Sequence, residues 1–207
     1  MNEELFVPLP SAKITNAPSH TLNWLRASGI VLAGSVLAAI CAHVSIPLFF
    51  TPVPLSLQPF AVLLLGLLLT PGMAATTFAV YLLEGAAGLP VFAPSLAMPG
   101  LAHLFGPTGG YLLAYPVASA LISFLWRRSG HGFAAALVSA AAGDAVVLVC
   151  GGLWMTILTH GALLHASVLA VAPFLPGDAL KIAAAAGMGF GLVRYRRSRE
   201  TRHKGEK

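Results

Sequence analysis

Long apolar stretches, each about as long as a membrane-spanning helix, dominate this sequence. The run from 166 to 193 contains only two charged residues, Asp178 and Lys181. A helix needs about 20 mainly apolar residues, at about 1.5 Å per residue, to cross the hydrocarbon core of a bilayer. Charged residues make up 9% of the 207-residue chain, whereas soluble domains carry about 25%. The sequence therefore predicts an all-α integral membrane protein.

Proline and glycine clusters divide the apolar sequence into six predicted spans. Proline is favoured at a helix start, so the "PGD" that contains Pro176 is predicted to open a new helix. It splits the last apolar run into a short outer helix, 164–172, and a sixth span. A six-helix transmembrane domain, 23–196, would then lie between a cytoplasmic tail, 1–22, and a basic cytoplasmic tail, 197–207. The six transmembrane helices are predicted at 27–46, 56–70, 73–89, 110–126, 133–157 and 177–195.

The distribution of positive charge predicts the orientation of these spans. An even number of crossings places both termini on one side of the membrane. Eleven of the twelve Lys and Arg residues then share that side, and seven of them lie within 194–207. The opposite loops, near 47–54, 90–109 and 158–163, contain no Lys or Arg. Because basic loops stay in the cytoplasm, both termini are predicted to be cytoplasmic. The same distribution argues against nucleic-acid binding.

Polar side chains from four predicted spans fall at one depth, in the outer leaflet. Asp178 and Lys181 open the sixth span, and their i,i+3 spacing puts them on one helix face, which must point inward. Helix capping explains Asp178, but a cation near a helix N-terminus opposes the macrodipole, so Lys181 needs another partner. This layer predicts a pocket open to the outside. Its other predicted members are Gln58, Tyr81, Glu84, Thr108 and Tyr111.

Several polar positions allow more than one interpretation. Glu84 is either a ligand contact or an acid that snorkels to the interface or pairs with Lys181. Asp144 is predicted nearer the midplane, where it serves either helix packing or a ligand. "FGPTGGY", at 105–111, offers backbone N–H groups at a helix entrance but lacks the Gly-Lys-Ser/Thr of a phosphate loop. The ATPase of an active transporter would therefore be on another chain. The histidine spacing fits no metal site.

The first predicted span carries small residues at four-residue spacing, Gly34, Ala38 and Ala42. Such a row lets two membrane helices approach closely. It indicates either packing within this bundle or a docking face for a partner subunit.

Four motifs together resemble the BioY family, the biotin-specific S-components of energy-coupling factor (ECF) vitamin transporters. They occur in the family's order: "TPVPLSLQPFAVLLLGLLL" at 51–69, "YLLEGAAGLPVFAPS" at 81–95, "FGPTGGYLLAYPVAS" at 105–119 and "PFLPGDALK" at 173–181. The resemblance implies a non-enzymatic, biotin-binding subunit in the bacterial plasma membrane, without a cofactor. It also implies partners besides biotin and membrane lipid, namely a transmembrane coupling subunit and two ATPase subunits.

The resemblance further implies roles for particular residues. In the family the Asp and Lys of this PGDxxK motif contact the ligand, which corresponds to Asp178 and Lys181. The small residues of the first helix dock on the coupling subunit, which corresponds to Gly34, Ala38 and Ala42. The loop that covers the pocket corresponds to Phe92 and to 103–111, with Thr108, Gly109, Gly110 and Tyr111. The chain departs from the family at "TPGM", 70–73, where basic residues are common, and at the variable stretch 94–104.

Other functions remain open at this stage. The same architecture suits an S-component for a different vitamin. An intramembrane enzyme that uses Asp144 or Glu84 would show turnover without partner subunits, and a structural subunit would bind no ligand. Biotin offers ureido N–H donors and a carbonyl, an apolar thioether ring and a carboxylate tail. An acid can accept from the ureido N–H groups, and an ammonium can meet the carbonyl or the tail, so the assignment of Asp178 and Lys181 stays open.

Overall fold

The computed structural model of the protein describes residues 19–94, 100–160 and 171–205. The predicted short outer helix, 164–172, lies almost entirely outside the described residues, and 171–174 form a turn. The helices of the described ranges are α1 (Ser19–His43), α2 (Gln58–Leu68), α3 (Pro71–Ala86), α4 (Leu101–Leu104), α5 (Gly109–Arg128), α6 (Phe133–Thr159) and α8 (Leu175–Gly205). α1 and α8 each extend into a stretch predicted as a tail.

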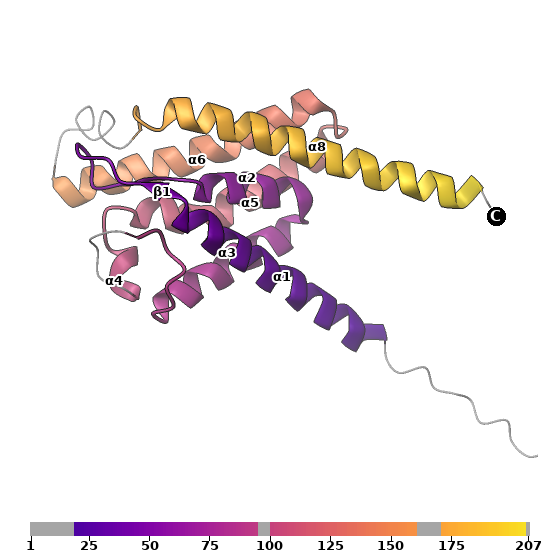
Figure 1. Ribbon diagram of the computed structural model, residues 1–207, viewed down its shortest axis with the longest axis horizontal. Helices are drawn as coiled ribbons and strands as arrows, with labels where there is room; N and C mark the ends of the chain where they lie inside the picture. The colour runs from indigo at the N-terminus through magenta and orange to yellow at the C-terminus, as the bar shows by residue number, and fades with distance from the viewer. Residues whose placement is uncertain (1–18, 95–99, 161–170, 206–207) are drawn as a thin grey trace, which may run out of the picture.

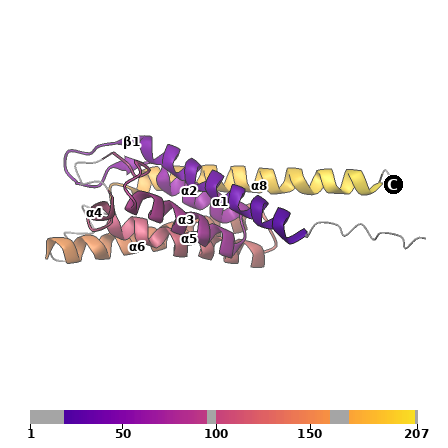
Figure 2. The ribbon, with the colours of Figure 1, turned by 90° about the horizontal axis from the view of Figure 1, so that it is seen from below.

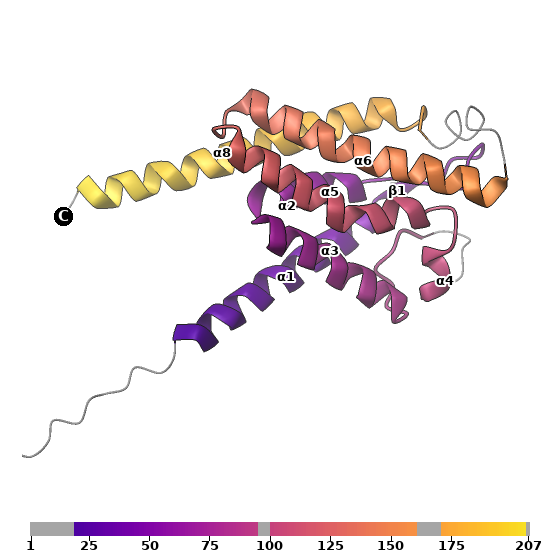
Figure 3. The ribbon, with the colours of Figure 1, turned by 180° about the vertical axis from the view of Figure 1, so that it is seen from behind.

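The long helices form two layers. α1, α2 and α8 lie in the layer facing the viewer in Figure 1, and α3, α5 and α6 lie side by side in the layer seen from behind in Figure 3. Figure 2 shows the two layers edge-on. α2 is the most enclosed helix, because it packs against α8, α5 and α1 and most of its side chains are buried. The start of α1 and the end of α8 point to the same end of the molecule (Figure 1).

Local sequence explains where these helices begin and end. Thr70 caps α3 by accepting a hydrogen bond from the backbone N–H of Met73, and Pro71 occupies the first turn, where its missing N–H costs nothing. Gly88, with a φ of 93°, follows the end of α3 in a backbone conformation that glycine adopts easily. At the start of α8, the backbone N–H of Asp178 donates to the carbonyl of Phe174, 2.8 Å away.

Among the described residues, three helical segments are long and apolar enough to cross a membrane, namely Asn23–His43, Gly109–Arg128 and Phe133–Thr159. α2 has 11 residues, which gives it a length of about 17 Å, well short of a hydrocarbon core of about 30 Å. The predicted second span therefore corresponds to a short buried helix. α8 is longer than the predicted sixth span, because its basic end continues as helix to Gly205.

Two short features were not predicted. β1 (Ser45–Ile46) and β2 (Leu55–Ser56) pair antiparallel, with Ser45 opposite Ser56, so the proline-rich connection after α1 folds back as a hairpin. α4 is a single turn within the connection between α3 and α5. Both features lie at the end of the molecule opposite the termini (Figure 1). β2 and α4 each contribute to the lining of the cavity described next.

Candidate ligand-binding site

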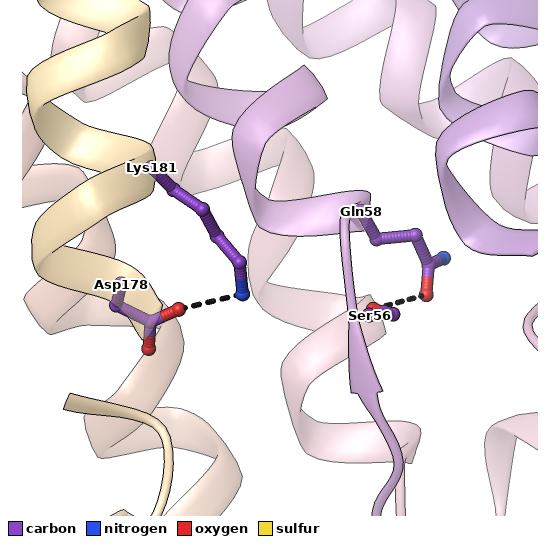
Figure 4. A network of polar contacts seen from close by, with 4 residues as sticks. All are labelled: Ser56, Gln58, Asp178 and Lys181. Carbon is purple, nitrogen blue, oxygen red and sulfur yellow. Dashed lines mark hydrogen bonds and ion pairs between the residues drawn. The ribbon is translucent and has the colours of Figure 1, made fainter. Parts of the chain in front are cut away.

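Asp178 and Lys181 form a buried ion pair in the first turns of α8. The Lys181 Nζ atom lies 2.9 Å from Asp178 Oδ1, and the two side chains are 9% and 4% exposed. Their separation by three residues places them on one face of the helix, as the sequence predicted. Figure 4 shows both side chains on the side of α8 that faces Gln58 and Ser56. Asp178 thus neutralises a cation that the helix dipole disfavours at this position.

This ion pair lines a cavity between the two layers. The lining residues come from β2, α2, α4, α5, α6, α8 and their connections, and the space between them is open to solvent in part. Polar residues stand among apolar and aromatic neighbours, as is usual in small-molecule sites. The polar residues of the lining are Ser56, Gln58, His103, Thr108, Tyr111, Tyr115, Asp144, Asp178 and Lys181.

Aromatic rings form one wall of the cavity. Tyr111 and Phe174 meet edge to face, with ring centroids 6.1 Å apart. Tyr115 lies deeper and packs edge to face on Phe78 at 5.8 Å. Such contacts add about 0.5–1.5 kcal/mol each beyond the burial of the rings themselves. The wall can therefore hold an apolar ring system against a rigid surface.

A hydrogen-bonded chain orients Gln58 at the cavity. Gln58 Nε2 donates to the Tyr81 hydroxyl at 2.5 Å, and that hydroxyl donates to the carbonyl of Val91 at 2.8 Å. Ser56 lies 3.4 Å away from the Gln58 carbonyl oxygen (Figure 4). Tyr81 was predicted as a ligand contact, but it is fully buried behind Gln58 and does not line the cavity. Its place in the structure is that of a support for Gln58.

The connection between α3 and α5 is anchored by a stack of rings. Phe92 packs edge to face on Tyr81 at 5.5 Å and stacks on His103 at 4.9 Å. Phe92 therefore supports the cover of the cavity without lining it, whereas His103 lines the cavity, with its Nε2 3.3 Å from Thr108 Oγ1. Burial lowers the pKa of His103, because the charged imidazolium is poorly solvated there.

Three further predicted contacts lie away from the cavity. Glu84 is hydrogen-bonded to Ser35 of α1 and lines a separate groove between α1 and α3. Gly109 and Gly110 pack at the start of α5, where a Cβ on Gly110 would overlap Trp154. Trp154 in turn donates to the carbonyl of Gly106 at 2.9 Å. The glycines thus permit close contact between α5 and α6, and neither lines the cavity.

The row of small residues on α1 faces into the bundle. Ala38 and Ala42 are 1% and 0% exposed, and a Cβ on Gly34 would lie 2.7 Å from the Thr77 side chain of α3. Of the two interpretations of this row, the structure agrees with packing inside the bundle. These residues are thus buried within the bundle, and a role of Gly34, Ala38 and Ala42 in docking a partner stays a prediction.

Reasoning from the sequence left the role of one cavity residue open and did not single out several others. Asp144 was predicted at a different depth from the other polar residues, yet it lines the same cavity, because the cavity reaches down between α5 and α6. His103, Tyr115 and Phe174 were not singled out as contacts. They could have been predicted from the motifs that contain or adjoin them, "FGPTGGYLLAYPVAS" and "PFLPGDALK". Within the described ranges, no group of three His, Cys, Asp or Glu residues is placed to hold a metal ion.

Comparison with known proteins identifies the family. The model of the BioY family matches residues 14–198 of the chain. The chain belongs to the BioY family. A probable biotin transporter BioY of Pyrococcus horikoshii is 34% identical over 161 residues, which are 78% of this chain and 93% of the relative. The biotin transporter BioY of Thermotoga maritima is 36% identical over 152 residues, 73% of this chain and 86% of the relative.

The BioY relatives are named as transporters, and a solved structure shares their fold with this chain. The crystal structure of the S-component for biotin from an ECF-type ABC transporter aligns with a TM-score of 0.76 and 23% identity. The alignment covers 86% of this chain and 95% of that protein. This BioY chain therefore has the fold of an S-component, a helical membrane protein whose arrangement is conserved at low sequence identity.

Proposed function

We propose that this chain is the biotin-binding, substrate-specificity subunit of an ECF-type uptake transporter. The observation that carries the proposal is the buried Asp178–Lys181 pair at the cavity, at the position of the PGDxxK motif. Biotin needs acceptors for its ureido N–H groups, a donor for its carbonyl or its carboxylate, and an apolar wall for its fused rings. The acids, Lys181 and the Tyr111–Phe174 wall of this cavity supply these groups.

The transport step would be driven from other chains. A transmembrane coupling subunit and two ATPase subunits would complete the transporter, since the sequence contains no phosphate-binding loop. The six predicted spans would lie in a bacterial plasma membrane with both termini cytoplasmic. The cavity would then open to the outside, where the substrate is, and the basic end of α8 would lie in the cytoplasm. Co-purification of the tagged chain with coexpressed coupling and ATPase subunits tests this assembly.

Biotin binding by the purified chain tests the proposed function directly. Isothermal titration in detergent against a panel of vitamins should show high-affinity binding of biotin alone. Binding of a different vitamin would assign the chain to another substrate, and binding of none would contradict the proposal.

Removal of either charge of the ion pair should weaken biotin binding strongly. Loss of one partner of a buried charged pair costs about 2–5 kcal/mol in binding, so Asp178→Asn and Lys181→Ala should each lower affinity by about 30-fold or more. Leu180→Ala is the matched control, because Leu180 lies between the two on α8 and is 73% exposed. Titration of the purified variants with biotin measures the effect.

A lost charge could also unfold the protein, because breaking a buried pair costs about 3–5 kcal/mol of stability. The double variant Asp178→Asn/Lys181→Met removes both charges and should recover thermal stability without recovering biotin affinity. Affinity equal to the wild type in a folded double variant would show that the pair does not contact the ligand.

A further inference from the structure

The cavity contains more acidic than basic groups. Asp178 and Lys181 compensate each other at 2.9 Å. Asp144, which projects from α6, lines the same cavity and is 4% exposed. Among the described lining residues, Lys181 is the one with a permanent positive charge. The cavity thus holds two carboxyl groups and one ammonium, and the second carboxyl group has no cation of its own.

Asp144 also lacks a hydrogen-bond donor from the protein. In the described ranges, no side chain or backbone N–H is hydrogen-bonded to Asp144. Its oxygens are nevertheless not sealed in the interior, since no fully buried side-chain oxygen of the described residues is left without a partner. The Asp144 oxygens therefore face the cavity. A buried acid without a hydrogen-bond donor costs free energy, and most buried acids in proteins receive a hydrogen bond from the protein itself.

A purely structural role does not account for this arrangement. An acid that joined two helices would be hydrogen-bonded across the helix interface, and a polar residue of the same site shows such a bond. Gln58 is held in this way by Tyr81. Asp144 instead lies close enough to Asp178 and Lys181 to interact with both electrostatically. The protein thus places an acid in the α6 wall of the cavity, where a hydrogen-bond donor must come from a ligand.

We propose that Asp144 accepts hydrogen bonds from the N–H groups of the ligand ring and thereby sets the specificity of the cavity. This inference rests on the proposed function. It assigns the orientation of biotin: the ureido ring lies at Asp144, and the carboxylate tail points away from it. The reverse orientation would bring the tail carboxylate next to Asp144, a group of the same charge that has no cation of its own. Ligands that lack an N–H donor on the ring should be rejected.

The near-isosteric variant Asp144→Asn tests the proposal. A hydrogen bond to a charged acceptor is stronger than one to a neutral amide, so biotin affinity should fall about 10- to 100-fold. The affinity for an amide derivative of the biotin tail should fall by the same factor from wild type to variant, because both ligands contain the ring that Asp144 contacts. Thr156→Val, a near-isosteric change on α6 outside the cavity lining, is the control and should leave both affinities unchanged.

The unliganded protein provides a second measurement. Asp144→Asn removes an uncompensated acid beside Asp178, so the thermal unfolding midpoint without biotin should stay the same or rise. A large fall in that midpoint would instead assign Asp144 a structural role. Unchanged biotin affinity would exclude a ligand contact. A variant that binds biotin more tightly than the wild type does, without a gain in affinity for the tail amide, would reverse the orientation. If the wild type binds no biotin, the proposed function itself fails. That result is distinct from the outcomes above, which concern Asp144 alone.

Discussion

At the scale of single residues, the cavity is built from groups that the surrounding protein holds in unfavourable states. Lys181 is a cation near a helix N-terminus, where the macrodipole opposes it, and Asp178 compensates it at 2.9 Å. His103 is 5% exposed, which favours its neutral form. Each of these groups costs stability unless a partner or a ligand satisfies it. His103, whose pKa is lowered by burial, is therefore a residue of the site whose protonation should affect folding.

His103 should make the stability of the protein depend on pH. Burial lowers the pKa of His103 in the folded state, whereas the unfolded chain titrates near about 6.5. As the pH falls below that value, the unfolded state binds a proton that the folded state does not, so stability decreases by up to about 1.4 kcal/mol per pH unit. Thermal unfolding in detergent between about pH 7.5 and 5.5 should show a smaller decrease for His103→Gln than for the wild type.

The control for this effect is His43→Gln, since His43 lies exposed at the end of α1. This variant should keep the pH dependence of the wild type. If His103→Gln also keeps it, another group is responsible for the dependence.

The sequence predicted some of these residues and not others, for physical reasons. Asp178 and Lys181 could be predicted from the sequence, because a charged pair in an apolar run is unusual and the i,i+3 spacing defines a shared helix face. Tyr81 and Glu84 have the same apparent depth as the pair, but depth along a helix does not specify which side of the helix faces the cavity. Glu84 faces α1 as a result. That choice depends on packing between helices, which one sequence does not encode locally.

At the scale of elements, glycines determine how closely α5 and α6 approach. Gly110 of α5 packs on Trp154, while Gly143 and Gly151 of α6 pack on Ile122 and Tyr111 of α5. Small residues let membrane helices make such contacts. The positions of the long helices followed from apolar length and proline, but the β1–β2 hairpin and α4 are too short to leave a periodic pattern. These short elements, together with the contact between α5 and α6, place the cavity walls.

A side chain at Gly110 should therefore disturb the helix pair. In Gly110→Ala the new Cβ would overlap Trp154 and lie 2.7 Å from the backbone oxygen of Cys150, which cannot move without shifting α6. Overpacking of this kind costs about 1–3 kcal/mol. The thermal unfolding midpoint in detergent should fall clearly. Gly187→Ala is the matched control, because nothing lies within 4 Å of a Cβ there, and it should be neutral or stabilising by up to about 1 kcal/mol. Equal midpoints in the two variants would show that the α5–α6 contact is not tight.

At the scale of the whole molecule, the cavity and most basic residues of the described ranges lie at opposite ends. The hairpin, α4 and the start of α8 surround the cavity at one end, while the start of α1 and the end of α8 lie at the other (Figure 1). Arg127 and Arg128 end α5, and further arginines follow along α8 from Arg194. Positive charge retained in the cytoplasm would therefore turn the cavity outward. In this architecture, the basic residues that orient the chain also determine which side of the membrane the cavity faces.

Cysteine labelling can test this orientation in spheroplasts, starting from a variant in which Cys41 and Cys150 are replaced. Phe49 lies exposed in the connection between β1 and β2, at the cavity end, and Ser129 lies exposed in the turn after α5. A membrane-impermeant maleimide should label Phe49→Cys in intact spheroplasts and should label Ser129→Cys only after lysis. The two sites control for each other, because lysis should make both reactive. Labelling of Ser129→Cys alone in intact spheroplasts would invert the orientation, and the cavity would then face the cytoplasm, where it could not receive an external substrate.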